Sequence, residues 1–129
     1  MLEREGLSAQ ALPVDVLQST QPILMRGLVK HWPMVQAALK SEHDYCEYLR
    51  QFGADTKLSL WRAPPEANGR FFYNAEFSGF NFHQLDCSFG ALLDELLSHL
   101  NNPQPPCLYL GSTDLDRCFP ALRAQNDLH

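Results

Sequence analysis

The sequence predicts an α+β domain in which short helices alternate with short strands. Helical spacing is clearest in residues 89–100, where apolar side chains recur every three or four positions. Strand-like alternation is clearest in KLSLWRA, residues 57–63, where Leu58 and Leu60 point to one face. The chain of 129 residues fits a single domain, residues 1–129, with an ordinary globular content of 45% hydrophobic and 19% charged residues.

The N-terminal part predicts one strand after a surface lead-in. Residues 1–20 have a mixed composition and are expected to hold one helical turn near residues 14–18. QPILMRG, residues 21–27, is an apolar run bounded by a proline and a glycine, which indicates a short strand. Pro33 predicts the start of a helix, because the residue before a proline avoids the α region.

Two further helices carry recognisable start signals. Ser41 and Ser88 each precede an amphipathic segment and are expected to be N-caps. Gly53 is expected to be the C′ residue of the helix that follows Ser41. The apolar faces of the two helices are predicted to be Tyr45, Tyr48, Leu49 and Phe52 in the first, and Phe89, Leu92, Leu93, Leu96, Leu97 and Leu100 in the second.

The remaining strands are predicted around two turns. PPEANGR, residues 64–70, contains two prolines and an Asn-Gly pair suited to positive φ, so RFFY, residues 70–73, is expected to return as a strand pairing with KLSLW. CLYLGS, residues 107–112, reads as another strand closed by a glycine. Residues 113–129 are expected to hold one short helical turn.

RFFYNAEFSGFNF, residues 70–82, places six aromatic residues in thirteen positions and includes only two charges, Arg70 and Glu76. Two interpretations remain open, namely core packing and the wall of a substrate site. Tyr73 and Asn74 are the candidate substrate-binding residues, because their polar ends need partners.

Charge and hydropathy exclude several classes of protein. The net charge is −5 and the ten Lys and Arg residues are scattered, so we expect no direct binding to nucleic acid. No run approaches the ~20 apolar residues of a membrane span, so we expect no membrane association. The N-terminus lacks the apolar region of a secretory signal, which predicts a cytoplasmic protein. Its four cysteines are then expected to be reduced and to behave as small hydrophobic residues.

The sequence offers no complete catalytic or metal-binding motif. An Fe(II) site needs two His and one carboxylate on one face, and on a strand the first two ligands would be spaced as H-x-D or H-x-E. None of the five histidines begins such a triplet. The nearest pair is His83 and Asp86, which would need a helical turn to converge. We therefore assign no catalytic and no metal-binding residue.

The order of several segments resembles one family. PILMRGLVKHWP, RFFYNAEFSGFNF, PPCLYLGST and FPALRAQNDL follow one another as in the cupin-like, JmjC-related oxygenases, which include the factor-inhibiting-HIF asparaginyl hydroxylase. The resemblance spans residues 22–128. It implies that the chain supplies the N-terminal helices and strands of a double-stranded β-helix, or jelly roll, whose catalytic half is absent.

The same resemblance implies cofactors and site residues. Such enzymes use Fe(II) and 2-oxoglutarate to hydroxylate protein or RNA side chains, and their H-x-D and distal His ligands follow the segment that resembles FPALRAQNDL. This chain alone is therefore predicted to be inactive and to hold no cofactor. Tyr109 matches a tyrosine that contacts 2-oxoglutarate, and Tyr73 and Asn74 match a segment near the substrate groove.

Two other functions remain open. A non-catalytic interaction module with the family's N-terminal architecture would pair CLYLGS or RFFY with a partner, and exposed strand edges would allow self-association. An unrelated small enzyme would use His83, Asp86 or a pair of carboxylates.

Overall fold

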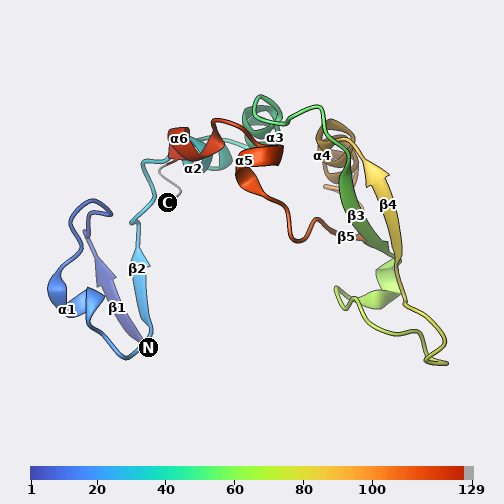
Figure 1. Ribbon diagram of the computed structural model, residues 1–129, viewed down its shortest axis with the longest axis horizontal. Helices are drawn as coiled ribbons and strands as arrows, with labels where there is room; N and C mark the ends of the chain where they lie inside the picture. The colour runs from blue at the N-terminus through green and yellow to red at the C-terminus, as the bar shows by residue number, and fades with distance from the viewer. Residues whose placement is uncertain (127–129) are drawn as a thin grey trace.

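A computed structural model describes residues 1–126 as an arch with a leg at each end (Figure 1). The first leg holds two strands and one helical turn, the top of the arch holds four helices, and the second leg holds a three-stranded sheet with a helix beside it. The predicted α+β class is confirmed. Residues 127–129, which end the predicted C-terminal segment, lie outside the described part of the chain.

The first leg is a parallel strand pair. Strand β2 (Ile23–Arg26) lies where the apolar run predicted it, and Gly27 follows with a φ of +70°. Helix α1 (Val14–Leu17) confirms the predicted turn in the lead-in. Strand β1 (Leu2–Glu5), which pairs with β2, was not predicted, because all four of its residues are exposed and LERE shows no apolar alternation.

The helices at the top of the arch begin as predicted. Helix α2 (Pro33–Ala38) starts at its proline, after Trp32 in an extended conformation. Helix α3 (Glu42–Arg50) is capped by Ser41, whose side chain accepts a hydrogen bond from Asp44 N at 3.0 Å.

The expected role of Gly53 is wrong. Helix α3 ends at Arg50, and Gly53 does not have the positive φ of a C′ residue. A Cβ atom at this position would lie 2.9 Å from Phe89 Cδ1, so the glycine allows close packing against helix α4 (Phe89–Ser98).

The second leg contains an antiparallel sheet in the order β4-β3-β5. Strands β3 (Leu58–Ala63) and β5 (Cys107–Tyr109) were predicted, although β5 is shorter than the expected run. The expected pairing of RFFY is wrong, since β4 (His83–Cys87) pairs with β3 instead. After the turn, where Asn68 and Gly69 do have positive φ, the aromatic residues form a loop rather than a strand.

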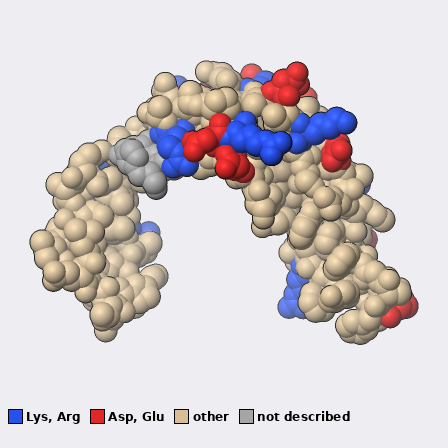
Figure 2. Space-filling model, in the orientation of Figure 1, with Lys and Arg blue, Asp and Glu red and all other residues tan. Residues whose placement is uncertain are grey.

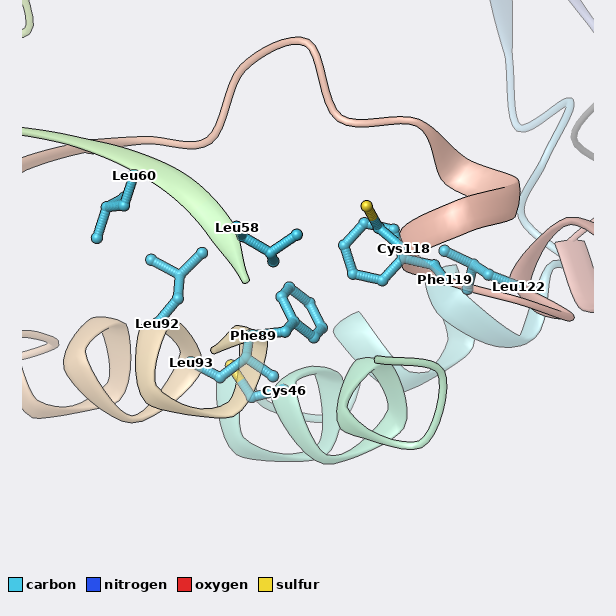
Figure 3. Close-up of a cluster of buried hydrophobic side chains, with 9 residues drawn as sticks. All are labelled: Cys46, Leu58, Leu60, Phe89, Leu92, Leu93, Cys118, Phe119 and Leu122. Atoms are coloured by element: carbon cyan, nitrogen blue, oxygen red, sulfur yellow. The ribbon is translucent and has the colours of Figure 1, made fainter. Parts of the chain in front are cut away.

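The hydrophobic core joins the sheet to the helices (Figure 3). Leu58 and Leu60 point from β3 toward α4, and Phe89 packs edge-on against Phe119 with ring centroids 4.6 Å apart. Ser88 caps α4 as predicted, through a hydrogen bond from Ala91 N. The remaining core members come from four helices: Cys46, Leu92, Leu93, Cys118 and Leu122.

The predicted apolar faces are only partly buried. Leu96 and Leu100 of the α4 stripe stay 43% and 45% exposed. On α3 the buried residue is Cys46, and Tyr48, Leu49 and Phe52 are partly buried against the core. The four thiols are free, and Cys46 and Cys118 are buried as small hydrophobic side chains, as expected.

The C-terminal segment holds two short helices, α5 (Leu115–Cys118) and α6 (Leu122–Asn126), where one turn was predicted. Both return to the top of the arch, and α6 lies beside α2 (Figure 1). Over residues 1–126, no helix has the length and apolar character needed to cross a bilayer.

Candidate functional site

One face of the second-leg sheet is covered by aromatic rings. Trp61 on β3 is paired with Gln84 on β4 and with Tyr109 on β5, so the three side chains share a face. This face is opposite to Leu58 and Leu60, because successive residues of a strand point to alternate sides. The sheet therefore has a core face toward α4 and a second face that is available for other contacts.

The loop of residues 70–82, which we call the aromatic loop, folds over Trp61. Phe82 stacks on Trp61 with ring centroids 4.7 Å apart and an interplanar angle of 16°. Phe71 contacts both Trp61, at 6.2 Å, and Tyr109, at 5.7 Å. Offset and edge-on ring pairs of this kind stabilise a fold beyond the area they bury.

The stack continues outward from Phe82. Phe80 lies 4.9 Å from Phe82, and Tyr73 lies 5.3 Å from Phe80, with interplanar angles of 28° and 23°. The outer two rings are more exposed than the inner one, because Phe82 is half-buried whereas Phe80 and Tyr73 are 58% and 50% exposed. The inner rings of the aromatic loop are thus packed, whereas its outer rings are exposed, and their role as the wall of a substrate site stays a prediction.

An open pocket of about 310 Å³ lies between the outer rings and the sheet. This volume is close to the lower limit for small-molecule sites. Its lining contains no Lys, Arg, Asp or Glu within residues 1–126 and consists of Trp61, Phe71, Phe72, Tyr73, Phe80, Phe82 and Gln84.

Charge lies elsewhere on the molecule. Figure 2 shows charged groups along the top of the arch and few on the visible face of either leg. Inside the pocket lining, the Gln84 amide donates a hydrogen bond to Ser59 Oγ at 2.6 Å. The pocket is therefore apolar and uncharged, and it suits a ring or an aliphatic group better than an ion.

Two asparagines hold the aromatic loop in shape. Asn81 accepts a hydrogen bond from Phe72 N and donates one to Arg70 O, at 2.9 and 2.8 Å. Asn74 accepts from Ser78 N and Gly79 N through its side-chain oxygen. Both amides are thus engaged within the loop, and they position the rings between them.

The described residues do not provide an iron site. His83 and Asp86 lie on strand β4, where residues three apart point to opposite faces. Within residues 1–126, no three His, Cys, Asp or Glu side chains come close enough together to hold a metal ion. The described residues thus contain no cluster of the kind that a two-His, one-carboxylate Fe(II) site requires.

Burial raises the pKa of two cysteine thiols. Desolvation raises the pKa of the Cys46 thiol, and the nearby Arg50 guanidinium opposes this shift with a smaller effect. Desolvation also raises the pKa of Cys87, at the end of β4, and the carboxylates of Glu95 and Asp86 add to the shift. Both thiols are consequently held in the protonated, weakly nucleophilic form.

Comparison with known protein families shows to which family the chain belongs. A family model described as a cupin-like domain matches residues 9–129. The chain belongs to the cupin-like domain family. The match includes the sheet and the aromatic loop, and it extends over nearly the whole chain. No match was found among curated proteins or among solved structures.

Within this cupin-like domain, Tyr109 lies against the inner rings. Its ring packs edge-on against Trp61 at 5.6 Å and is 48% exposed. Its hydroxyl forms no hydrogen bond with any residue of the described chain and is free to meet a ligand. Contact with 2-oxoglutarate stays a prediction.

Tyr73 and Asn74 are placed differently from one another. Tyr73 lines the pocket, whereas Asn74 does not, because its amide closes the turn at residues 74–79. A series of ring contacts, through Phe80, Phe82 and Trp61, connects Tyr73 to Tyr109. Their substrate-binding role likewise stays a prediction.

The sequence reasoning missed Trp61 and Gln84 as pocket residues. A signal for Trp61 was present, since the alternation in residues 57–63 places it on the face opposite to Leu58 and Leu60. Gln84 gave no such signal, because β4 was not recognised as a strand.

Proposed function

We propose that this chain is the N-terminal part of a cupin-like, Fe(II)- and 2-oxoglutarate-dependent oxygenase of the hydroxylase type. The family match over residues 9–129 carries the proposal. We expect the iron ligands to come from outside residues 1–126, in which no three possible metal ligands lie together. No step of the oxidation is therefore assigned to these residues, and the chain alone is expected to be inactive.

The chain's own contribution is then binding and support. The free hydroxyl of Tyr109 offers a hydrogen bond to a carboxylate of 2-oxoglutarate, and the rings of Trp61 and Phe71 fix its orientation. The outer rings of the aromatic loop, including Tyr73, form an apolar wall for a substrate side chain. Because no described residue of the lining is Lys or Arg, the lining offers no cation to an RNA phosphate.

Two measurements test the proposal. The purified chain, given Fe(II), 2-oxoglutarate and oxygen, is expected to form no succinate above a protein-free blank. The endogenous protein, captured from its own cells with an antibody to this chain, is expected to have an intact mass well above 14.7 kDa. The additional sequence is expected to contain H-x-D and a distal His.

Either measurement can contradict the proposal that this chain binds and supports while residues outside it hold the iron. Succinate formed by the chain alone would show that it builds an iron site of its own. An endogenous mass of 14.7 kDa would instead favour a non-catalytic interaction module. The open aromatic wall and the two sheet edges, β4 and β5, are the features that support that second function.

A further inference from the structure

The aromatic loop lies at the lower end of the second leg (Figure 1), and its outer rings form an exposed apolar patch. Phe72, Tyr73, Phe77 and Phe80 are 62%, 50%, 75% and 58% exposed. Because a fully covered aromatic side chain buries about 150–250 Å², these four leave roughly 500 Å² uncovered. This area is more than half of the ~800 Å² that each partner contributes to a standard protein interface.

Phe77 is the most exposed of these rings, and its backbone has an unfavourable conformation. Its φ is +54°, in the left-handed region that bulky residues rarely adopt. Its backbone N–H donates to Asn74 O at 3.1 Å, so the turn fixes this conformation. Strained residues concentrate at sites of contact or function. The turn thus presents a phenylalanine ring to solvent at a position better suited to glycine or asparagine.

A projecting ring and an open pocket lie side by side on this surface. Phe77 does not line the pocket, but its ring centroid is 6.3 Å from that of Tyr73, which does. A surface that carries a projection next to a complementary hollow can pair with itself about a two-fold axis. We propose that the aromatic loop is a self-association surface and that its partner is a second copy of this chain. The Phe77 ring of each copy enters the pocket of the other.

The two charges of the aromatic loop fit this arrangement. Neither Arg70 nor Glu76 forms an ion pair within residues 1–126. Arg70 precedes Phe71, which lines the pocket, and Glu76 precedes Phe77, which enters it. Insertion of Phe77 brings the backbone that carries Glu76 in one copy toward the backbone that carries Arg70 in the other, which allows an ion pair between them. Because of the two-fold axis, this contact between opposite charges occurs twice in each dimer.

This pairing does not depend on the proposed oxygenase function. The Phe77 ring and a substrate side chain would use the same pocket, so pairing would compete with substrate binding. Pairing needs no iron and no 2-oxoglutarate, and its readout is the mass of the species in solution. The chain can dimerise whether or not it belongs to an oxygenase, and an oxygenase can be confirmed whether or not the chain dimerises.

Sedimentation equilibrium of the full chain over a concentration series tests the proposal. A reversible monomer–dimer equilibrium is expected. Phe77→Asn is expected to raise the dissociation constant by about tenfold or more, since central aromatic residues dominate interfaces. Asparagine tolerates positive φ, so urea unfolding should show a monomer at least as stable as wild type. Leu39→Asn is the matched control. Leu39 is 73% exposed at the end of α2, which lies at the top of the arch, so its replacement should leave dimerisation unchanged.

Charge reversal tests the geometry. Arg70→Glu and Glu76→Arg are each expected to weaken the dimer by about fivefold, and the double variant is expected to restore it. A chain that stays monomeric overturns the proposal, as does a dimer insensitive to Phe77→Asn. Open-ended aggregates overturn it as well, because they indicate a contact that does not close. Failure of the double variant to restore binding overturns the predicted orientation of the two loops.

Discussion

The side-chain oxygen of Asn126 accepts a hydrogen bond from the backbone N–H of Met34 at 2.9 Å, across 92 residues of sequence. Met34 is the second residue of α2, whose N-cap residue, Trp32, contributes no side-chain hydrogen bond. The first N–H groups of a helix have no partner inside it. Asn126 therefore caps α2 from the far end of the described chain.

The same side chain should be important for stability. Asn126 is fully buried, and its amide also donates to Tyr48 Oη and Leu122 O, at 2.9 and 3.0 Å. Asn126→Ala removes all three hydrogen bonds and is expected to lower the free energy of unfolding by about 2–4 kcal/mol. Tyr48→Phe removes one of them and should cost only about 1 kcal/mol. Urea unfolding measures both, and equal losses would show that Asn126 acts through Tyr48 alone.

A second prediction concerns the close approach at Gly53. A Cβ there would lie 2.9 Å from Phe89 Cδ1 and 3.3 Å from Phe89 Cβ, in the middle of the core. Gly53→Ala is therefore expected to destabilise the protein by about 1–3 kcal/mol. Gly79→Ala is the control, because its Cβ would meet the nearest atom at an ordinary 3.7 Å, so this change should be neutral or slightly stabilising. The prediction fails if the thermal midpoints of the two variants agree.

Sequence patterns correctly predicted the helix ends and the strand that depend on neighbouring residues in the chain. The N-caps at Ser41 and Ser88, the helix start at Pro33 and the strand at residues 58–63 depend on residues within one turn of each other, and all are present. Strands β1 and β4 depend instead on distant partners. HQLDC has only Leu85 and Cys87 as alternating apolar residues, a pattern too short to predict a strand without knowledge of its pairing with β3.

The candidate site was only partly predictable for the same reason. The composition of the aromatic loop was plain in the sequence, but its path was not, because RFFY could pair with β3 or pack on it. Packing prevails where Phe71 and Phe82 cover Trp61. Asn74 shows a related limit, since the sequence did not indicate that its side chain closes a turn.

A third prediction concerns thiol reactivity. Burial raises the pKa of Cys46 and Cys87 above the ordinary value of 9.0, so alkylation by iodoacetamide at pH 8 should be much slower in the folded chain than in urea. As pH rises above 9.0, the unfolded thiols lose their protons before the folded ones do. The free energy of unfolding should therefore fall as pH rises from 9.0 toward the higher pKa of the folded state. Peptide mass spectrometry reads the labelling, and equal folded and unfolded rates would contradict the prediction.

A fourth prediction tests the packing of Tyr109. The chain has two tryptophans, so Trp32→Phe leaves Trp61 as the fluorescent reporter of the aromatic cluster. Tyr109→Ala uncovers Trp61 and should shift its emission to longer wavelength, whereas Tyr109→Phe keeps the ring and should not. Gly111→Ala would place a Cβ 2.3 Å from Tyr109 Cε1, so it should displace the ring and produce a shift of its own. An unchanged spectrum for Gly111→Ala would show that the ring has room to adjust without leaving Trp61.

The last prediction links Tyr109 to the proposed function and uses the endogenous protein, in which the iron ligands are expected. Loss of a hydrogen bond to a charged group costs about 1.5–3 kcal/mol. Tyr109→Phe should therefore raise the 2-oxoglutarate concentration needed for half-maximal turnover by about tenfold or more. Stability should not change, since the hydroxyl has no partner in the described part of the chain. Tyr73→Phe is the matched control, because it removes a hydroxyl from the outer end of the ring stack and should leave the 2-oxoglutarate requirement unaltered. Equal effects of the two changes would show that Tyr109 does not contact 2-oxoglutarate.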